Sequence, residues 1–207
     1  MQLYGVENTK EFRLAFHALI PAAGTGTRLR GEQPKQYLAL AGRPMLWHAA
    51  RAVCLPPVEN LFVVLSPEDR EFARHDWSAF GARLEPLYCG GATRRDSVYN
   101  GLVAAMAAVE ADDWILVHDA ARPCLPRRDL DSLIAETRED AIGGILALPA
   151  ADTVKKAMKD EAGAVEQLGL SPRLVAGSRE NIKVTFPEDL KIAEAILKNR
   201  GGDTGQR

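Results

Sequence analysis

The chain has 207 residues, of which 46% are hydrophobic and 26% are charged, and its formal net charge is −2. This length suits one well-packed core and is short for two, so we expect a single domain over residues 1–207. The slightly negative charge excludes the broad basic field of a nucleic-acid-binding protein, and no apolar run reaches the length of a membrane span, so neither nucleic acid nor a membrane is an expected partner.

The N-terminal residues and the cysteines both favour a reducing compartment. Residues 1–16 lack the basic start and continuous apolar core of a signal peptide, so we expect a cytoplasmic protein. Cys54, Cys89 and Cys124 are odd in number and widely separated, and they form no Cys-x-x-Cys pair, so we expect buried or semi-buried thiols. The four histidines show no metal-ligand spacing, and no zinc site is expected.

The first half of the chain alternates apolar strand patterns with helical ones. After a polar lead-in at residues 1–13, Ala18–Ile20 is the end of a predicted buried strand. A helix is predicted to open at Pro44, since proline favours the first helical position. The continuous apolar run Leu61–Leu65 is typical of a strand covered on both faces, and Ser66–Asp69 has the capping hydroxyl, proline and acids of a helix start.

The second half repeats this alternation. The predicted elements, in chain order, are a strand at 84–88, a tight turn at 90–93, a helix opened by Thr93-x-x-Asp96 and running to Val109, a strand at 114–117, a helix around Leu130–Ile134, a strand at 142–148, a helix capped by Thr185-Phe-Pro-Glu188, and a disordered tail at about 200–207. Such alternation implies an α/β fold, a mainly parallel sheet with helices on both faces.

Three motifs fall at the carboxyl ends of predicted strands. They are the loop that follows Ile20, the turn at Gly90, and Asp119 after the strand at 114–117. Because the carboxyl ends of parallel strands meet at one edge of a sheet, where ligands of such sheets bind, we expect these motifs to form one site.

The first of these loops has almost no side-chain bulk. Small residues let a ligand approach the backbone, and consecutive free N–H groups suit anions. The residues that we expect to contact the ligand in this way are Pro21, Ala22, Ala23, Gly24, Thr25, Gly26 and Thr27. The cations Arg28 and Lys35 follow, which indicates a bound polyphosphate. A P-loop is excluded because no Lys-Ser or Lys-Thr pair follows the glycines, and a dinucleotide fingerprint is excluded because Leu29 occupies the place of its third small residue.

Read together, three motifs resemble one family. They occur in the order found in the 2-C-methyl-D-erythritol 4-phosphate cytidylyltransferases of the non-mevalonate isoprenoid pathway. The first motif is Pro21–Arg28 with Pro34–Tyr37, the second is His118–Pro123, and the third is Asn181–Thr185. The resemblance implies a three-layer, Rossmann-like nucleotidyltransferase fold with a mostly parallel twisted sheet and a protruding β-arm at about 150–166. It also implies the substrates CTP and a polyol phosphate, the cofactor Mg²⁺ and a homodimer.

The resemblance also implies roles for individual residues. Catalysis would depend on Arg28 and Lys35 beside the triphosphate and on Lys183, which would orient the attacking phosphate. Further nucleotide contacts would come from Gly90, Gly91, Ala92, Ser97 and Ala120, with Ala92 restricted to its backbone because the family often has an acid there. Substrate contacts would come from Asp119, Arg122, Thr153 and Thr185, with Thr153 often serving the neighbouring subunit.

Asp119 has two possible roles, one implied by the resemblance and one that the residues alone would explain. A carboxylate at the end of an apolar strand is costly unless it is paired or binds a metal. The family reading gives Asp119 to Mg²⁺, which takes one or two carboxylates plus substrate phosphates. A helix cap or a salt bridge to Arg122 is the alternative.

The chain departs from the family after Thr153. Family members have several dozen more residues there, with an arginine near a Leu-Trp run, a Thr-Pro-Gln motif and a Thr-Asp-Glu-Ala stretch on the substrate side, and none of these is present. A parallel crossover usually needs a dozen or more residues with a helix, and Ala162–Leu170 provides barely two turns. Either the given sequence omits a segment, or the chain is a variant that has lost part of its polyol-phosphate site. The first explanation is favoured, because the flanking residues match the family on both sides.

Three functions therefore remain open. The first is transfer of a cytidylyl group from CTP to 2-C-methyl-D-erythritol 4-phosphate, and the second is the same transfer to ribitol 5-phosphate. The pair Ala120–Ala121 favours the first, since ribitol enzymes tend to have valine at the second small position. The third is a nucleotide-binding protein without turnover, which the missing segment would allow.

Overall fold

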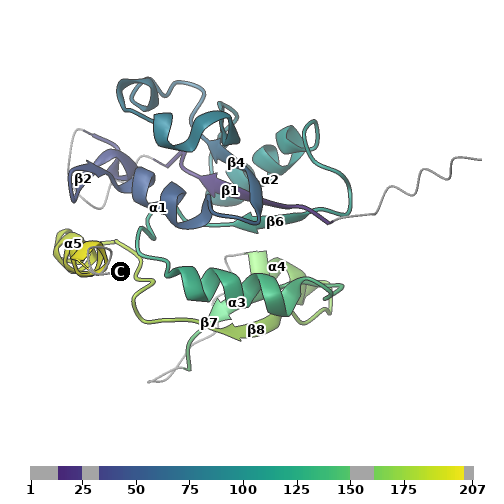
Figure 1. Ribbon diagram of the computed structural model, residues 1–207. Coiled ribbons are helices and arrows are strands. Elements are labelled where there is room, and N and C mark those ends of the chain that lie inside the picture. The colour runs from purple at the N-terminus through teal and green to yellow at the C-terminus, as the bar shows by residue number, and fades with distance from the viewer. Residues whose placement is uncertain (1–13, 25–32, 150–160, 203–207) are drawn as a thin grey trace, which may run out of the picture.

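The computed structural model describes residues 14–24, 33–149 and 161–202. A four-stranded parallel sheet lies at its centre, built from β1 (Phe16–Pro21), β4 (Val58–Val64), β5 (Leu84–Leu87) and β6 (Trp114–Val117) in the order β5-β4-β1-β6 (Figure 1). These are the strands predicted near residues 20, 61–65, 84–88 and 114–117. The lead-in expected at 1–13 lies outside the described residues.

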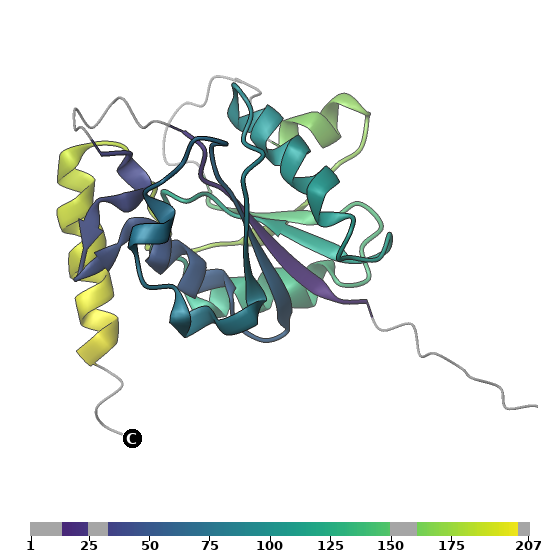
Figure 2. The same ribbon diagram turned by 90° about the horizontal axis from the view of Figure 1, so that it is seen from above.

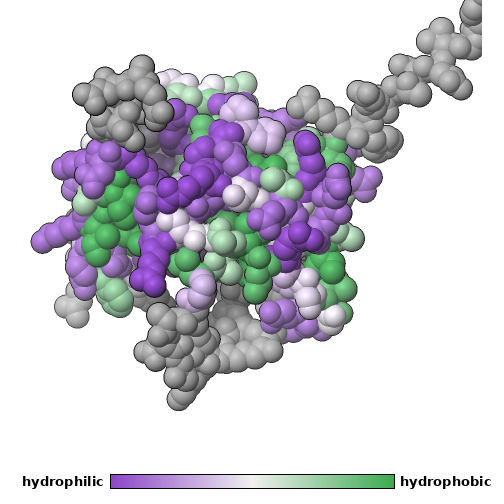
Figure 3. Space-filling model, turned by 60° about the horizontal axis from the view of Figure 1, so that its bottom comes forward, coloured by the Kyte–Doolittle hydropathy of each residue, from purple (hydrophilic) through white to green (hydrophobic). Residues whose placement is uncertain are grey.

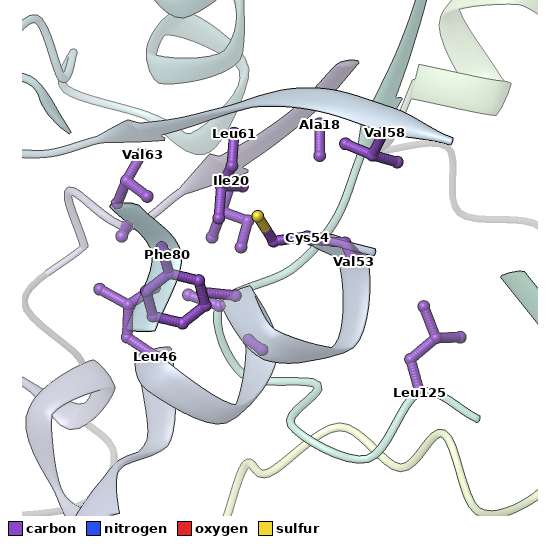
Figure 4. Packing of buried hydrophobic residues seen from close by; sticks show 14 of the residues in the cluster. Ala18, Ile20, Leu46, Val53, Cys54, Val58, Leu61, Val63, Phe80 and Leu125 are labelled. Atoms are coloured by element: carbon purple, nitrogen blue, oxygen red, sulfur yellow. The ribbon is translucent and has the colours of Figure 1, made fainter. Parts of the chain in front are cut away.

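The two inner strands of this sheet, β1 and β4, are buried on both faces, as the continuous apolar run of β4 predicted. Ala18, Ile20, Leu61 and Val63 form one core cluster with α1 (Met45–Val53), part of which is seen in Figure 4. The alternate residues Leu19, Phe62 and Val64 form a second cluster with α2 (Arg94–Ala105) on the opposite face. This arrangement is the three-layer order of an α/β nucleotidyltransferase fold (Figure 2).

The remaining elements extend the layers. They are the antiparallel pair β2 (Ala39–Leu40) and β3 (Arg43–Pro44), the 3-10 helices Lys35–Tyr37, Phe72–Arg74 and Ser78–Arg83, α3 (Arg127–Thr137), the parallel pair β7 (Gly144–Ala147) and β8 (Arg173–Ala176), α4 (Glu161–Gln167), and α5 (Pro187–Gly202). Residues 150–160 of the expected β-arm lie outside the described residues, and the expectation is wrong for residues 161–166, which are helical as part of α4. Among the described helices, none has the length and apolar character needed to cross a membrane.

The helix predicted to begin at Ser66–Asp69 does not form there. Residues 67–68 form a turn, and Asp69 Oδ1 accepts hydrogen bonds of 2.9 Å from the N–H groups of both Glu71 and Phe72, at the start of the 3-10 helix Phe72–Arg74. Its Oδ2 accepts a 2.7 Å hydrogen bond from the Tyr37 hydroxyl. The acid that resembled a first-turn residue therefore joins two loops.

Three helix ends also differ from the prediction. Helix α2 begins with the expected capping box of Thr93 and Asp96 but ends at Ala105, short of Val109. Helix α5 is capped by Asp189, whose Oδ2 accepts from the N–H groups of Thr185 and Phe186 at 2.8 and 2.9 Å, in place of the predicted Glu188. Helix α5 also continues to residue 202, into the predicted tail.

The three cysteines are free thiols. Cys54 and Cys124 are buried and Cys89 is intermediate, as predicted. Burial raises the pKa of all three thiols, and that of Cys124 reaches about 11, which keeps them protonated and unreactive at neutral pH.

Candidate active site

A cleft of about 420 Å³ opens at the carboxyl ends of the central strands. Strand order reverses at β1, which lies between β4 and β6, and ligands of open α/β sheets bind at such a reversal. The residues that line it are Pro21, Ala22, Ala23, Gly24, Lys35, Gln36, Gly91, Ala92, Thr93, Arg94, Ser97, Asp119, Ala120, Ala121 and Lys183.

Most of the predicted site residues that the structure describes line this cleft. Gly90, Arg122 and Thr185 are the described exceptions, since they do not line it. Thr25, Gly26, Thr27, Arg28 and Thr153 lie outside the described residues. Segments that are far apart in the sequence thus meet, as the strand-end argument predicted.

The loop after β1 is held against the sheet by backbone and side-chain hydrogen bonds. The Ala22 N–H donates to the Val64 carbonyl at 2.7 Å, and the buried Gln36 side chain donates to the Ala22 carbonyl at 2.7 Å. Sequence reasoning gave Gln36 no role, although its place beside Lys35 was visible. Next to this anchored residue, Gly24 has open space where a Cβ would be, which leaves the backbone accessible to a ligand.

The turn after β5 needs both of its glycines. A Cβ on Gly90 would lie 2.2 Å from the Cβ of Ala23, and a Cβ on Gly91 would lie 2.5 Å from the Cβ of Asp96. The Ser97 hydroxyl holds this turn, since it accepts from the Gly91 N–H at 3.1 Å and donates to the Thr93 carbonyl at 2.9 Å. Gly90 therefore allows two loops of the cleft to touch, and Ser97 shapes the turn that we expect to contact the base.

Asp119 is surrounded by cations. Its Oδ1 accepts from Arg94 Nε at 2.9 Å and Nη2 at 2.8 Å, and its Oδ2 lies 2.8 Å from Lys183 Nζ and 3.6 Å from Arg122 Nε. Burial by itself would raise the pKa of Asp119, but the hydrogen bond from Lys183 and the charges of Arg94 and Lys183 outweigh it and lower the pKa to about 2. Asp119 is therefore ionised at neutral pH.

The segment that carries Lys183 is fixed by its backbone. The Val184 N–H donates to the Ala121 carbonyl at 2.8 Å, and Arg122 Nη1 donates to the Asn181 carbonyl at 2.7 Å. A small apolar cluster, which includes Val184 and Ala193 of α5, packs beneath. The Asp119 loop and the Lys183 segment are thus one structural unit, although 64 positions separate the two residues in the sequence.

Arg94 is a cleft residue that sequence reasoning missed. It is the first residue of α2, directly after the Gly90–Thr93 turn, and its side chain lines the cleft. Its place after a capping box and beside the expected base-binding turn was the available clue. Nothing in the spacing indicated that it reaches Asp119, 25 residues away.

The cleft residues fit a magnesium ion only if the substrate supplies further ligands. Asp119 is the one carboxylate among the described lining residues, and no group of three or more His, Cys, Asp or Glu side chains among the described residues could hold a metal. Mg²⁺ is commonly bound by one or two carboxylates together with substrate phosphates and water. An ionised Asp119 in a cleft of this size, which has room for the phosphates of a nucleotide, is compatible with that donor set.

The fold and the cleft together define an enzyme class, the α/β nucleotidyltransferases, with a small-residue loop and a carboxylate among cations at the carboxyl ends of parallel strands. Comparison with known proteins narrows the class. The family model described as 2-C-methyl-D-erythritol 4-phosphate cytidylyltransferase (IspD) matches residues 16–160 and 156–199, so the chain belongs to this family of cytidylyltransferases.

Individual relatives agree with this assignment. The 2-C-methyl-D-erythritol 4-phosphate cytidylyltransferase of Nitrosospira multiformis is 48% identical over 227 residues, which cover 89% of this chain and 98% of the relative. That of Dechloromonas aromatica is 44% identical over 223 residues, with the same shares. A crystal structure of 4-diphosphocytidyl-2C-methyl-D-erythritol synthase superposes with a TM-score of 0.78 at 33% identity, over 89% of this chain and 99% of the other.

The comparisons also locate the departure from the family. Since 89% of 207 residues is about 184, about 43 of the 227 aligned positions of the Nitrosospira relative have no counterpart here. The family model matches in two pieces that meet at 156–160, just after Thr153. Beyond this break, Leu168 is 76% and Leu174 68% exposed. Figure 3, which shows mainly the side that faces down in Figure 1, has apolar residues exposed among hydrophilic ones.

Proposed function

We propose that this chain transfers the cytidylyl group of CTP to 2-C-methyl-D-erythritol 4-phosphate, giving 4-diphosphocytidyl-2-C-methyl-D-erythritol and pyrophosphate, in isoprenoid precursor biosynthesis. The observation that carries the proposal is the meeting of the Pro21–Gly24 loop, the Gly91–Ala92 turn, Asp119 and Lys183 in one cleft of a member of this family. A cytoplasmic location follows from the sequence expectation and remains part of the proposal.

The reaction demands cations. An oxygen of the acceptor monoester attacks the α-phosphorus of CTP, and the bond from that phosphorus to the oxygen that bridges to the β-phosphorus breaks, so that pyrophosphate leaves. Two unit charges 4 Å apart repel by about 4 kcal/mol at an effective dielectric of 20, and both reactants are multiply charged. Lys35 lines the cleft beside the small-residue loop, where it offsets charge on the triphosphate, together with Arg28.

Lys183 serves the attacking phosphate in this scheme. Its ammonium group is 2.8 Å from Asp119 and its side chain is 46% exposed, so one donor holds the carboxylate while two others are directed elsewhere. Because Val184 ties its backbone to the Asp119 loop, the position of the ammonium is preorganised. The family resemblance adds Arg122, Thr185 and Thr153 as further contacts of the acceptor.

The pyrimidine would lie against the Gly90–Ala92 turn. Backbone N–H and C=O groups there read the base edge, and a wrong base would leave them unpaired, which is how such sites discriminate. Ser97 supports this by fixing the turn through its bonds to Gly91 and Thr93. Ala92 has no acidic side chain, so its contact would be made by its backbone.

Asp119 would hold Mg²⁺ together with phosphate oxygens of the nucleotide. The ion would neutralise charge on the triphosphate and on the departing pyrophosphate. The chain's contribution is an ionised carboxylate kept in place by Arg94 and Lys183.

We further propose a homodimer in which Thr153 of one subunit completes the polyol-phosphate site of the other. Residues 155–161 include five charged residues, so the sequence of this segment offers little apolar surface to bury. A lone two-stranded ribbon is marginal in water, so an arm of this kind needs a partner. Light scattering at tens of micromolar tests this directly, and a monomer would overturn it.

A pyrophosphate-release assay tests the activity. CTP, UTP, ATP and GTP are each combined with 2-C-methyl-D-erythritol 4-phosphate and with ribitol 5-phosphate, and we expect release from CTP with the first acceptor well above every other pair. Faster release with ribitol 5-phosphate would contradict the acceptor. Tight CTP binding without any pyrophosphate release would identify a nucleotide-binding protein without turnover. If the purified protein then has an intact mass near 22.6 kDa, the lost activity is explained by the family positions that are missing after Thr153.

A further inference from the structure

Arg94 begins α2 from a rigid backbone position. Thr93 Oγ1 accepts from the Asp96 N–H at 3.1 Å, and Asp96 Oδ2 accepts from the Thr93 N–H at 3.2 Å, so the helix start is closed by a capping box. Ser97 holds the turn that precedes it. The Cα of Arg94 is therefore fixed at the edge of the cleft, and its side chain lines the cleft with 36% of its surface exposed.

The two oxygens of Asp119 have different cationic neighbours. Arg94 places both Nε and Nη2 on Oδ1, at 2.9 and 2.8 Å, while Lys183 Nζ is 2.8 Å from Oδ2. A carboxylate held at both ends by groups on different elements cannot rotate about its χ2 bond without losing one of them. The forked contact also occupies the acceptor sites of Oδ1, which leaves the remaining lone pair on Oδ2.

Arg122 lies on the side to which the Asp119 carboxylate would turn if Arg94 were absent. Its Nε is 3.6 Å from Oδ2, too far for a hydrogen bond, and its Nη1 is bound to the Asn181 carbonyl at 2.7 Å. Without Arg94, Asp119 keeps Lys183 and Arg122, which both lie on the Oδ2 side. Rotation towards this pair would remove the carboxylate from the orientation that it has in the cleft.

We propose that Arg94 is a positioning residue that holds Asp119 in the orientation required for binding the metal–nucleotide complex. The inference rests on the proposed function, since it takes Asp119 as the metal-binding carboxylate. It adds a residue outside the expected set of cations and gives it a role distinct from theirs. Lys35 acts on the triphosphate directly, whereas Arg94 acts through Asp119. Groups that orient a metal ligand typically change metal affinity or activity by about 10- to 100-fold when removed.

The test compares Arg94→Gln with Arg95→Gln, the neighbouring residue on the same helix, whose side chain is 91% exposed. Mn²⁺ binding is measured by electron paramagnetic resonance in the presence of a CTP analogue with a methylene group between the α- and β-phosphorus atoms. We expect Arg94→Gln to weaken Mn²⁺ binding by about 10- to 100-fold and to change metal-free binding of the analogue by less than about threefold. Arg95→Gln should match the wild type. Arg94→Lys keeps the positive charge but has one ammonium group in place of the two forked N–H groups, so it should recover part of the lost Mn²⁺ affinity.

Two results would overturn the inference. Mn²⁺ affinity of Arg94→Gln within twofold of the wild type would show that Asp119 needs no such support. Unchanged Mn²⁺ affinity with a large loss of metal-free analogue binding would make Arg94 a direct phosphate contact. Both differ from a failure of the proposed function, in which the wild type itself would bind no Mn²⁺ with the analogue and the role of Asp119 would fall as well. Arg94→Lys keeps the charge, so the comparison stands if Arg94→Gln does not fold.

Discussion

Replacing Asp119 with asparagine should destabilise the free protein as well as inactivate it. The pKa of Asp119 is about 2 in the folded protein and 3.8 in the unfolded reference, and one pKa unit corresponds to about 1.36 kcal/mol, which gives ~2.5 kcal/mol. Arg94, Arg122 and Lys183, the cations around it, have side chains 36–46% exposed, so solvent screening reduces this to about 2 kcal/mol. Asp119→Asn loses that contribution and removes the negative charge that these three cations share.

The pH dependence has a definite sign. Because the folded-state pKa of Asp119 is lowered, its stabilisation is fully present above the unfolded value of 3.8 and is lost as the pH falls through about 2. The difference in unfolding free energy between wild type and Asp119→Asn should therefore be about 2 kcal/mol at pH 7. It should fall to about half of that near pH 3.

Urea unfolding followed by circular dichroism at several pH values measures this difference, and at pH 7 the melting temperature should fall by roughly 4–8 °C. Asp131→Asn is the matched control, since Asp131 pairs with Arg127 at 2.7 Å on an exposed helix face and should cost less than about 0.5 kcal/mol. An Asp119→Asn variant as stable as the wild type at pH 7, or a difference that does not shrink in acid, would refute the electrostatic account of this site.

The other predictions concern the cations, the glycines and the assembly. Lys35→Ala and Lys183→Ala should each lower kcat by about 10²–10³-fold in steady-state pyrophosphate release. Lys198→Ala should change kcat little, because Lys198 forms an exposed pair with Glu194 on the same helix. Equal losses in all three variants would contradict the site. Gly90→Ala should raise the KM for CTP and lower the melting temperature, because the added Cβ would collide with the facing loop. Gly24→Ala, which has open space at its Cβ, should fold as stably as the wild type. Matching melting curves for the two variants would contradict the packing argument. Light scattering should give twice the monomer mass, and a monomer would contradict the shared site.

The central fold could be predicted because its strands are apolar on both faces. Leu61–Leu65 had no polar residue to suggest an exposed side, and it lies between α1 and α2 in the structure. The capping box at Thr93 likewise worked because both of its members are local. Ser66–Asp69 has the same local features but no helix, since Asp69 is engaged by Tyr37 from another part of the chain. Local chemistry predicted an element correctly where no distant side chain competed for it.

In the candidate site, too, local sequence features could be predicted and contacts between distant segments could not. The strand-end argument brought the loop after β1, the turn after β5 and Asp119 together without any knowledge of distances. The partners of Asp119 could not be derived in this way, because Arg94 and Lys183 reach it from elements whose relative placement depends on the packed core. Gln36 was missed for the same reason, since its bond to the Ala22 carbonyl exists only when both segments are folded against the sheet.

Phosphorus-31 magnetic resonance of the protein with CTP, 2-C-methyl-D-erythritol 4-phosphate and Mg²⁺ tests the central claim most directly, because it follows every phosphorus atom of the reaction. We predict that the triphosphate and monoester signals decline together while pyrophosphate and a pair of coupled signals from a diphosphate diester grow in equal amounts. Asp119→Asn should show neither product over the same period. Loss of CTP without consumption of the monoester, or a spectrum that does not change with active controls present, would contradict the proposed transfer.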